Sequence, residues 1–236
     1  MQNFDKDGVK CVFVRHGESK HNQVLHENET LTDEHHKKMA SMSNSSLTDK
    51  GKAQAQETAK HLYQKSKKMG YKKFVVWISP FARTVETAAP FVDLINSDDE
   101  VTKEIKYVTE LYEHTDIDKI IDSELSAIGI KHDLTQEDFI KRVIDFNEIF
   151  KAKLETLDNQ TLVIIFGHSH FLSILLTYLN THNEFKDIKQ SSLALPNCSI
   201  STLRYKAKKS ELWTIYHISS ISHLPDELKT GHHTLF

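Results

Sequence analysis

Two arginines and two histidines follow short apolar runs of the sequence, in positions where their side chains could act together on an anion. Arg15 and His16 come directly after one run, Arg83 follows a second and His168 follows a third. A guanidinium group stays protonated and offers a planar fork of donors, whereas a neutral imidazole nitrogen can attack phosphorus. We therefore expect Arg15 and Arg83 to clamp a phosphoryl group. We expect His16 to carry that group as a phosphohistidine, and His168 to stabilise charge during the transfer.

This chemistry needs two further groups near His16. Gly17 would let the backbone approach closely, and its carbonyl oxygen would accept a hydrogen bond from one ring nitrogen of His16, which fixes the tautomer. The departing alkoxide needs a proton, which a carboxylic acid with a raised pKa usually supplies. We therefore expect a carboxylic acid in the same site.

The apolar runs predict the strands that position these residues. They are Lys10–Val14, Phe74–Ile78, Leu162–Phe166 and Ser199–Tyr205, with a fifth run, Leu212–Ile218, that can pair with the fourth as a hairpin. The first three are continuously apolar, as expected for strands that helices cover on both faces. Such strands belong to a mostly parallel sheet.

Helical patterns lie between these runs. They cover Thr48–Gln64, with Thr48 as N-cap, then Pro80–Pro90, Glu137–Leu157 and Phe171–Leu179. Alternating strands and helices predict an α/β fold, a three-layer α/β/α sandwich with a mostly parallel central sheet. Ligands bind at the carboxyl ends of such strands, which places the chemistry just after Val14, Ile78 and Phe166.

The remaining segments are polar. We find no repeat and no interdomain linker, and we expect one domain over residues 1–236. Gln23–Ser46 is interpreted as an inserted polar loop with one short helix around Thr32–Ala40. Ser97–Thr102 is interpreted as a polar connection, and the residues from Ser219 onward as a poorly defined tail.

Composition excludes several classes of protein. The formal net charge of −3 gives no general attraction to nucleic acid or anionic membrane. The N-terminus lacks the apolar stretch of a secretory signal, and no apolar run is long enough to span a membrane. Cys11 and Cys198 both lie in apolar surroundings, which favours free thiols in a reducing compartment. We expect a cytoplasmic protein.

Four groups of residues carry a family resemblance, in the family's order. They are Arg15-His16-Gly17-Glu18-Ser19 with Asn22, Leu47-Thr48 to Gly51 with Gln54-Ala55, Ser79-Pro80 to Arg83 with Thr87-Ala88, and Gly167-His168-Ser169. Together they resemble the histidine phosphatase superfamily, also called the phosphoglycerate mutase-like family. The resemblance covers Cys11 to about Ser169, and the closing strands match less well.

The resemblance implies a role for each matching residue. His16 is the phosphorylated histidine, while Arg15, Arg83 and His168 form the phosphate pocket. Asn22 is a further ligand of phosphate or substrate. The proton donor of such enzymes is often a glutamate in a Leu-x-Glu setting, which implies Glu113, with Glu110 as the alternative.

The implied function is a phosphatase that hydrolyses a phosphomonoester, either a small molecule or a phosphoprotein, without cofactor or metal. His168 and His170, or His35 and His36, could suggest a metal site, but no spaced ligand set completes one. His114-Thr115-Asp116 replaces the family's aromatic-glycine pattern, which favours a phosphatase over a phosphomutase. A phosphomutase and a catalytically idle binding module remain alternatives, and neither the substrate nor the oligomeric state follows from the sequence.

Overall fold

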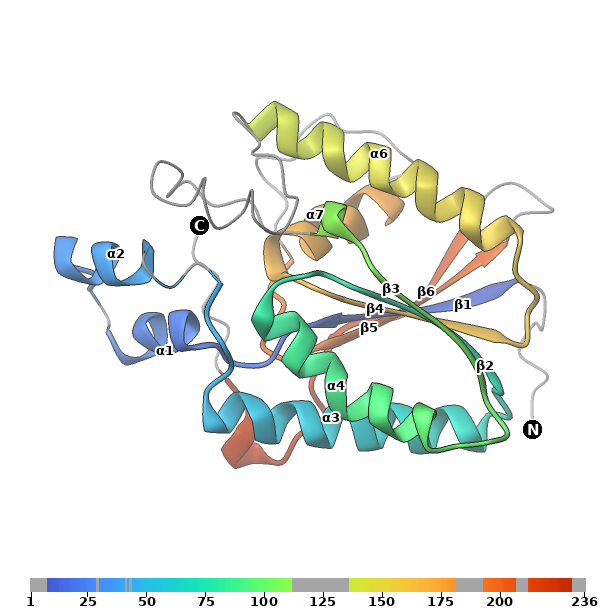
Figure 1. Ribbon diagram of the computed structural model, residues 1–236. Coiled ribbons are helices and arrows are strands. Elements are labelled where there is room, and N and C mark those ends of the chain that lie inside the picture. Colours follow the sequence, from blue (N-terminus) through green and yellow to red (C-terminus); the bar gives the residue numbers. More distant parts are fainter. Residues whose placement is uncertain are drawn as a thin grey trace.

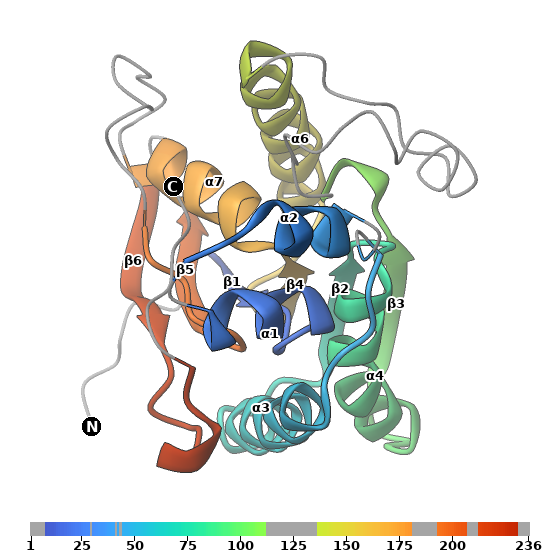
Figure 2. The ribbon, with the colours of Figure 1, turned by 90° about the vertical axis from the view of Figure 1, so that its left-hand side faces the viewer.

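A six-stranded sheet forms the centre of the molecule (Figure 1). The structure is a computed structural model that describes residues 8–28, 30–40, 42, 44–111, 136–180, 193–206 and 212–230. The strand order is β3-β2-β4-β1-β5-β6, and Figure 2 shows it end-on. The strands are β1 (Val9–Arg15), β2 (Lys73–Ile78), β3 (Thr102–Tyr107), β4 (Thr161–Gly167), β5 (Ile200–Lys206) and β6 (Leu212–Ser220).

Pairing within the sheet is mostly parallel. β1 to β4 run parallel to one another, whereas β5 pairs antiparallel with β1 and β6 pairs antiparallel with β5. The predicted α/β fold and the predicted hairpin between the last two strands are therefore confirmed. The continuous apolar character of β4 matches its position, since all seven of its residues are buried.

Helices cover both faces of the sheet. α3 (Asp49–Lys68) and α4 (Ala82–Asn96) lie on one face, and α6 (Gln136–Glu155) and α7 (Ser169–Asn180) lie on the other (Figure 1). α1 (Lys20–Glu27) and α2 (Asp33–Ala40) lie beyond the carboxyl end of β1 (Figure 2). No helix among the described segments is both long enough and apolar enough to cross a bilayer.

Two apolar layers hold these helices on the sheet. The layer under α6 and α7 is rich in aromatic rings, and Trp77 meets Phe146 edge to face with ring centroids 5.8 Å apart. The layer under α3 and α4 includes Phe74 and Phe91, whose centroids are 5.8 Å apart. Each such side chain contributes roughly 1.5–3 kcal/mol of burial free energy. The sheet is thus fixed from both sides, which gives its strand ends a rigid frame.

One predicted boundary is wrong, and one strand is missing from the prediction. α4 does not end at Pro90 but continues to Asn96. Proline removes one backbone hydrogen bond from a helix, but Phe91 and Ile95 lie just beyond it with no exposed surface, and their burial outweighs that loss. β3 was not predicted, because it is an exposed edge strand whose sequence TKEIKY contains no apolar run.

The polar insert and the tail are more regular than expected. α2 confirms the short helix predicted around Thr32–Ala40, but α1 also reaches into the expected loop. Ser19 begins α1 with a capping box that includes Asn22. The interpretation of residues after Ser219 as an undefined tail is wrong through Thr230, because Leu224 is buried and a 3-10 turn forms at Asp226–Leu228.

Candidate active site

Three neighbouring strands end at one place. His16 follows β1, Ser79 follows β2 and His168 follows β4. The backbone N–H of His16 donates to the Gly167 carbonyl at 3.0 Å, and that of Ser79 donates to the Phe166 carbonyl at 3.0 Å. These bonds continue the sheet ladder past the strand ends. The three strand ends that the sequence predicts to carry the chemistry therefore lie next to one another.

His16 is held in one tautomer. Its ring is 2% exposed, and Nδ1 lies 2.7 Å from the Gly17 carbonyl oxygen. A carbonyl oxygen can only accept, so Nδ1 carries the hydrogen and the lone pair lies on Nε2. Burial, followed by the charges of Arg83 and Arg15, holds the pKa of His16 well below its ordinary value. The ring is therefore neutral at pH 7, with one nitrogen able to act as a nucleophile.

His168 lies beside His16. Their ring centroids are 5.3 Å apart, and the Ser79 hydroxyl lies 2.8 Å from Nε2 of His168. Phe81 meets the same ring edge to face at 5.1 Å. Burial and then Arg83 hold the pKa of His168 well below its ordinary value. Ser79 and Phe81 therefore fix the orientation of a second neutral imidazole.

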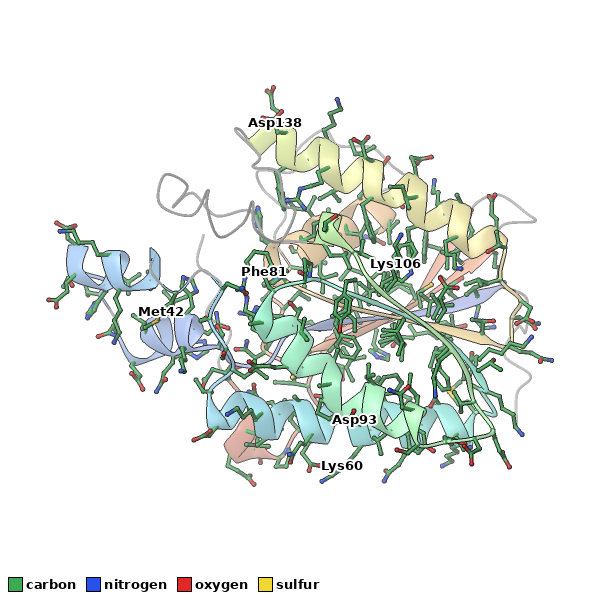
Figure 3. All side chains as sticks on the ribbon, in the orientation of Figure 1. Met42, Lys60, Phe81, Asp93, Lys106 and Asp138 are labelled. Carbon is green, nitrogen blue, oxygen red and sulfur yellow. The ribbon has the colours of Figure 1, made fainter. Side chains whose placement is uncertain are left out.

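Both predicted arginines reach this pair of histidines. Arg15 and Arg83 are 7% and 6% exposed, and each lowers the pKa of both imidazoles. Arg15 donates through a terminal nitrogen to the Leu195 carbonyl. The Arg83 guanidinium lies 4.6 Å from the centre of the Phe81 ring, which Figure 3 places at the start of α4. The structure thus gathers the four side chains that the sequence suggested.

The insert reaches the start of α4. The side-chain oxygen of Asn44 accepts a hydrogen bond from the Ala82 N–H at 2.8 Å, although Phe81 itself provides no side-chain cap. This bond satisfies one of the donors that a helix leaves open at its N-terminus. It also ties the insert to the turn that carries Arg83.

Sequence reasoning missed His21 in this group. Burial and then Arg83 and Arg15 lower the pKa of His21 to about 4, so the ring lies within the field of both arginines. It is carried by α1, directly before Asn22. No pattern distinguishes it, because it lies between Ser19 and Asn22 of the recognised group and matches none of that group's positions.

Asn22 is oriented by its neighbours. It is 7% exposed, and its Oδ1 accepts from Asn197 Nδ2 at 3.0 Å and from the Ser19 N–H at 3.4 Å. The structure therefore places Asn22 against the loop that carries His16. Its predicted contact with phosphate stays a prediction.

The loop after His16 packs closely on α3. A Cβ atom at Gly17 would lie 2.7 Å from the Gly51 carbonyl oxygen, and one at Gly51 would lie 2.0 Å from the Glu18 carbonyl oxygen. Only glycine allows such an approach of two backbones. Thr87 Oγ1 also accepts from the Gly17 N–H at 2.9 Å. The close approach predicted at Gly17 is therefore confirmed.

The predicted proton donor is not placed by the structure. Glu113 lies outside the described residues. Glu110 belongs to a 3-10 turn, Thr109–Leu111, but its side chain is outside what the structure describes. The choice between the two stays a prediction.

The field of the site is positive. Beside burial, the charged side chains that most lower the pKa of His16 and His168 are Arg83 and Arg15, and Arg142 of α6 adds to this effect at His168. No three His, Cys, Asp or Glu side chains converge within the described part of the chain as metal ligands do. The arrangement suits a small anion with several oxygen atoms.

A family model and several solved structures resemble this chain over most of its length. The model is described as the histidine phosphatase superfamily (branch 1) and matches residues 11–217. An ecdysone phosphate phosphatase from Bombyx mori, in complex with tungstate, is 22% identical with a TM-score of 0.57, over 89% of this chain and 92% of that chain. No curated protein sequence matches.

Two further structures share the fold. A mutant phosphoserine phosphatase from Entamoeba histolytica, in complex with phosphoserine, is 19% identical with a TM-score of 0.55, over 92% of this chain and 100% of that chain. A mycobacterial glucosyl-3-phosphoglycerate phosphatase, in complex with inorganic phosphate, is 14% identical with a TM-score of 0.54, over the same shares of the two chains.

Proposed function

This chain belongs to the histidine phosphatase superfamily, and on that basis we propose that it hydrolyses phosphomonoesters through a phosphohistidine formed on His16. The observation that carries the proposal is the bond from Nδ1 of His16 to the Gly17 carbonyl. It leaves the lone pair on Nε2, in a ring that burial and the neighbouring arginines keep neutral by lowering its pKa.

The proposed reaction has two steps. In the first, Nε2 of His16 forms a bond to phosphorus, the ester P–O bond breaks, and a carboxylic acid gives its proton to the departing alkoxide. In the second, water attacks the phosphohistidine, the P–N bond breaks, and the same carboxylate takes a proton from the water. The products are an alcohol and inorganic phosphate, and the ring returns to its neutral state. We assign the acid to Glu113, with Glu110 as the alternative.

The polar side chains around His16 have distinct proposed roles. Arg15 and Arg83 hold the nonbridging oxygens, and His168 stabilises the charge that develops on the phosphoryl group. A preorganised donor of this kind typically contributes about 10²–10³ to turnover. Asn22 adds a neutral donor to the same anion.

We propose a phosphorylated small molecule or a phosphoprotein as the substrate. Two solved structures of this fold hold small phosphorylated ligands or products, phosphoserine in one and inorganic phosphate in the other. The insert, residues 23–46, lies beyond the carboxyl end of β1 with α1 and α2, as Figure 2 shows. We propose that this insert borders the pocket and sets the choice of substrate.

The test is a panel of phosphomonoesters, assayed at several pH values in EDTA with the native chain and His16→Ala. We expect release of inorganic phosphate by the native chain and a loss of at least about 10³-fold in His16→Ala. His61→Ala removes a histidine from α3, where it packs against His223, and serves as the matched control. Equal turnover by the native chain and His16→Ala would contradict the proposal. Interconversion of phosphate isomers would indicate a phosphomutase, and phosphate binding without turnover an idle binding module.

A further inference from the structure

The buried side-chain amide of Asn197 joins three separate segments of the chain. Asn197 is 1% exposed and lies in the turn before β5. Its Nδ2 group donates to the His16 carbonyl at 3.2 Å and to Asn22 Oδ1 at 3.0 Å. Its Oδ1 accepts from the Thr230 hydroxyl at 3.1 Å, and its backbone N–H donates to the same hydroxyl oxygen at 3.3 Å. Every polar atom of this side chain is engaged.

The His16 carbonyl fixes which way the Asn197 amide faces. A carbonyl oxygen can only accept, so the side of the amide that faces it must be the NH₂ group, and the Thr230 hydroxyl gives its one hydrogen to Oδ1 on the other side. Both hydrogens of the NH₂ group are then directed at acceptors, one on His16 and one on Asn22. Thr230 is 6% exposed, which protects this arrangement from water.

The same logic orients Asn22. Its Oδ1 receives Asn197 Nδ2 on one side and the Ser19 N–H on the other, which occupies both lone pairs of an amide oxygen. The Nδ2 group of Asn22 therefore faces away from these donors, and its side chain makes no hydrogen bond from that nitrogen to a described residue. An amide turned this way offers two N–H donors to an anion and keeps its oxygen away.

The main chain of His16 is held by the same turn. Its carbonyl oxygen accepts from Asn197 Nδ2 at 3.2 Å and from the Cys198 N–H at 3.2 Å. A second buried amide acts nearby in the same way. Gln54 accepts from the Glu18 N–H at 2.8 Å and donates to the Leu228 carbonyl at 2.7 Å. Residues 228–230 thus support the segment after β1, residues 16–18, through the side-chain amides of Asn197 and Gln54.

We propose that Asn197 is a positioning residue for phosphate binding, which Thr230 holds in place and which acts through the amide of Asn22 and the main chain of His16. This inference rests on the proposed function, since it assigns Asn22 to the bound phosphate. Without Asn197, the Asn22 amide can rotate and present its oxygen to the anion, which repels it. Asn197→Asp has a stronger effect, because a carboxylate at this position accepts from Nδ2 of Asn22 and turns the Asn22 oxygen toward the phosphate.

The test measures kcat and KM for p-nitrophenyl phosphate, and competitive inhibition by inorganic phosphate. We expect Asn197→Ala and Asn22→Ala each to raise KM and the phosphate inhibition constant about tenfold, the effect of one hydrogen bond to a charged group. Asn197→Asp raises both constants further. The double variant with both alanines has the same KM and phosphate inhibition constant as either single variant. The two effects do not multiply, because both changes remove the same contact, that between the Asn22 amide and the phosphate.

Matched variants separate positioning from folding. Thr230→Val removes the hydroxyl and raises KM about threefold, whereas Thr230→Ser keeps the hydroxyl and restores the native value. Asn147→Ala removes another fully buried carboxamide, on α6, and leaves KM unchanged. If Asn197→Ala lowers thermal stability while KM and phosphate inhibition stay native, or if its effect multiplies with that of Asn22→Ala, the inference is wrong. If His16→Ala retains native turnover, the proposed function itself has failed.

Discussion

Positive charges are exposed and paired at one end of the sheet and buried at the other. At the amino ends of β2 and β4, Lys73 pairs with Asp158, and about half of each side chain is exposed. At the carboxyl ends, Arg15 and Arg83 lie less than a tenth exposed among imidazoles, and after burial Arg83 has the largest effect on the pKa of both rings. Both ends belong to the same sheet, so the difference comes from the side chains at each end and not from the backbone fold.

The contrast indicates what each end is for. An exposed lysine beside a carboxylate gains little, because water already solvates both charges. Buried cations that repel one another lower stability unless an anion joins them, and such clusters occur where a ligand is bound. The carboxyl end therefore suits the negative ligand that we propose, whereas the exposed pair at the amino end adds little to either binding or stability.

The strongest test of this contrast is Arg83→Ala. We expect kcat/KM for p-nitrophenyl phosphate to fall by roughly 10²–10³, because one preorganised donor to the transferring group is lost. Thermal stability measured without phosphate stays level or rises, since one of the buried like charges has gone. A variant that unfolds at a clearly lower temperature would show that Arg83 holds the fold and would break the contrast.

Acid provides a second, smaller test. The pKa of His16 and of His168 is held well below 6.5 in the folded protein, so between pH 6.5 and those lower values the unfolded chain binds more protons. The free energy of unfolding is therefore highest above pH 6.5 and falls as the pH drops below it, by up to about 1.4 kcal/mol per pH unit for each ring. His21, with its pKa lowered to about 4, acts in the same direction.

The measurement is denaturant unfolding between pH 7 and pH 5, for the native chain and His168→Gln. We expect a shallower loss in the variant, because one ring has been removed. The ion pair at the amino end does not contribute in this range, because the pKa of Asp158 is lowered from 3.8 by its bonds to Lys73 and Thr161. Identical slopes for the two proteins would contradict the low pKa of His168.

The smallest expected effect is that of Lys73→Gln. Because the pair with Asp158 is exposed, we expect a change in Tm of no more than about 2 °C and native kcat/KM. Salt at high concentration should remove even that change, which differential scanning calorimetry can follow. A change in turnover would show that the two ends of the sheet are coupled.

Much of the fold follows from local patterns in the sequence. Continuous apolar residues predict β1, β2 and β4, and the rule for parallel sheets then places Arg15, His16 and His168 at one edge. Pro90 misleads because buried residues beyond it keep α4 helical, a tertiary effect that local propensity does not contain. The sequence does not predict β3, because an exposed edge strand requires no run of apolar side chains.

The supporting residues of the site are harder to predict. Gln54, Asn197 and Thr230 act through hydrogen bonds to segments that are distant in sequence. Gln54 belongs to a group that carries the family resemblance, but no periodic pattern marks the contacts of these residues. Ser79 was part of a recognised group, but its bond to His168 follows from the register of two strands. The positions of the two histidines and two arginines were therefore predictable from the sequence, whereas the residues that orient them required coordinates.

The bond between Asn197 and the His16 carbonyl spans 181 positions of the chain, and that between Gln54 and the Leu228 carbonyl spans 174. Closing loops of this length carries an entropic cost that the formation of local helices does not. When a denatured chain refolds, turnover should therefore return later than the helical circular dichroism signal, because it requires residues 197 and 228–230 to meet the segment that follows β1.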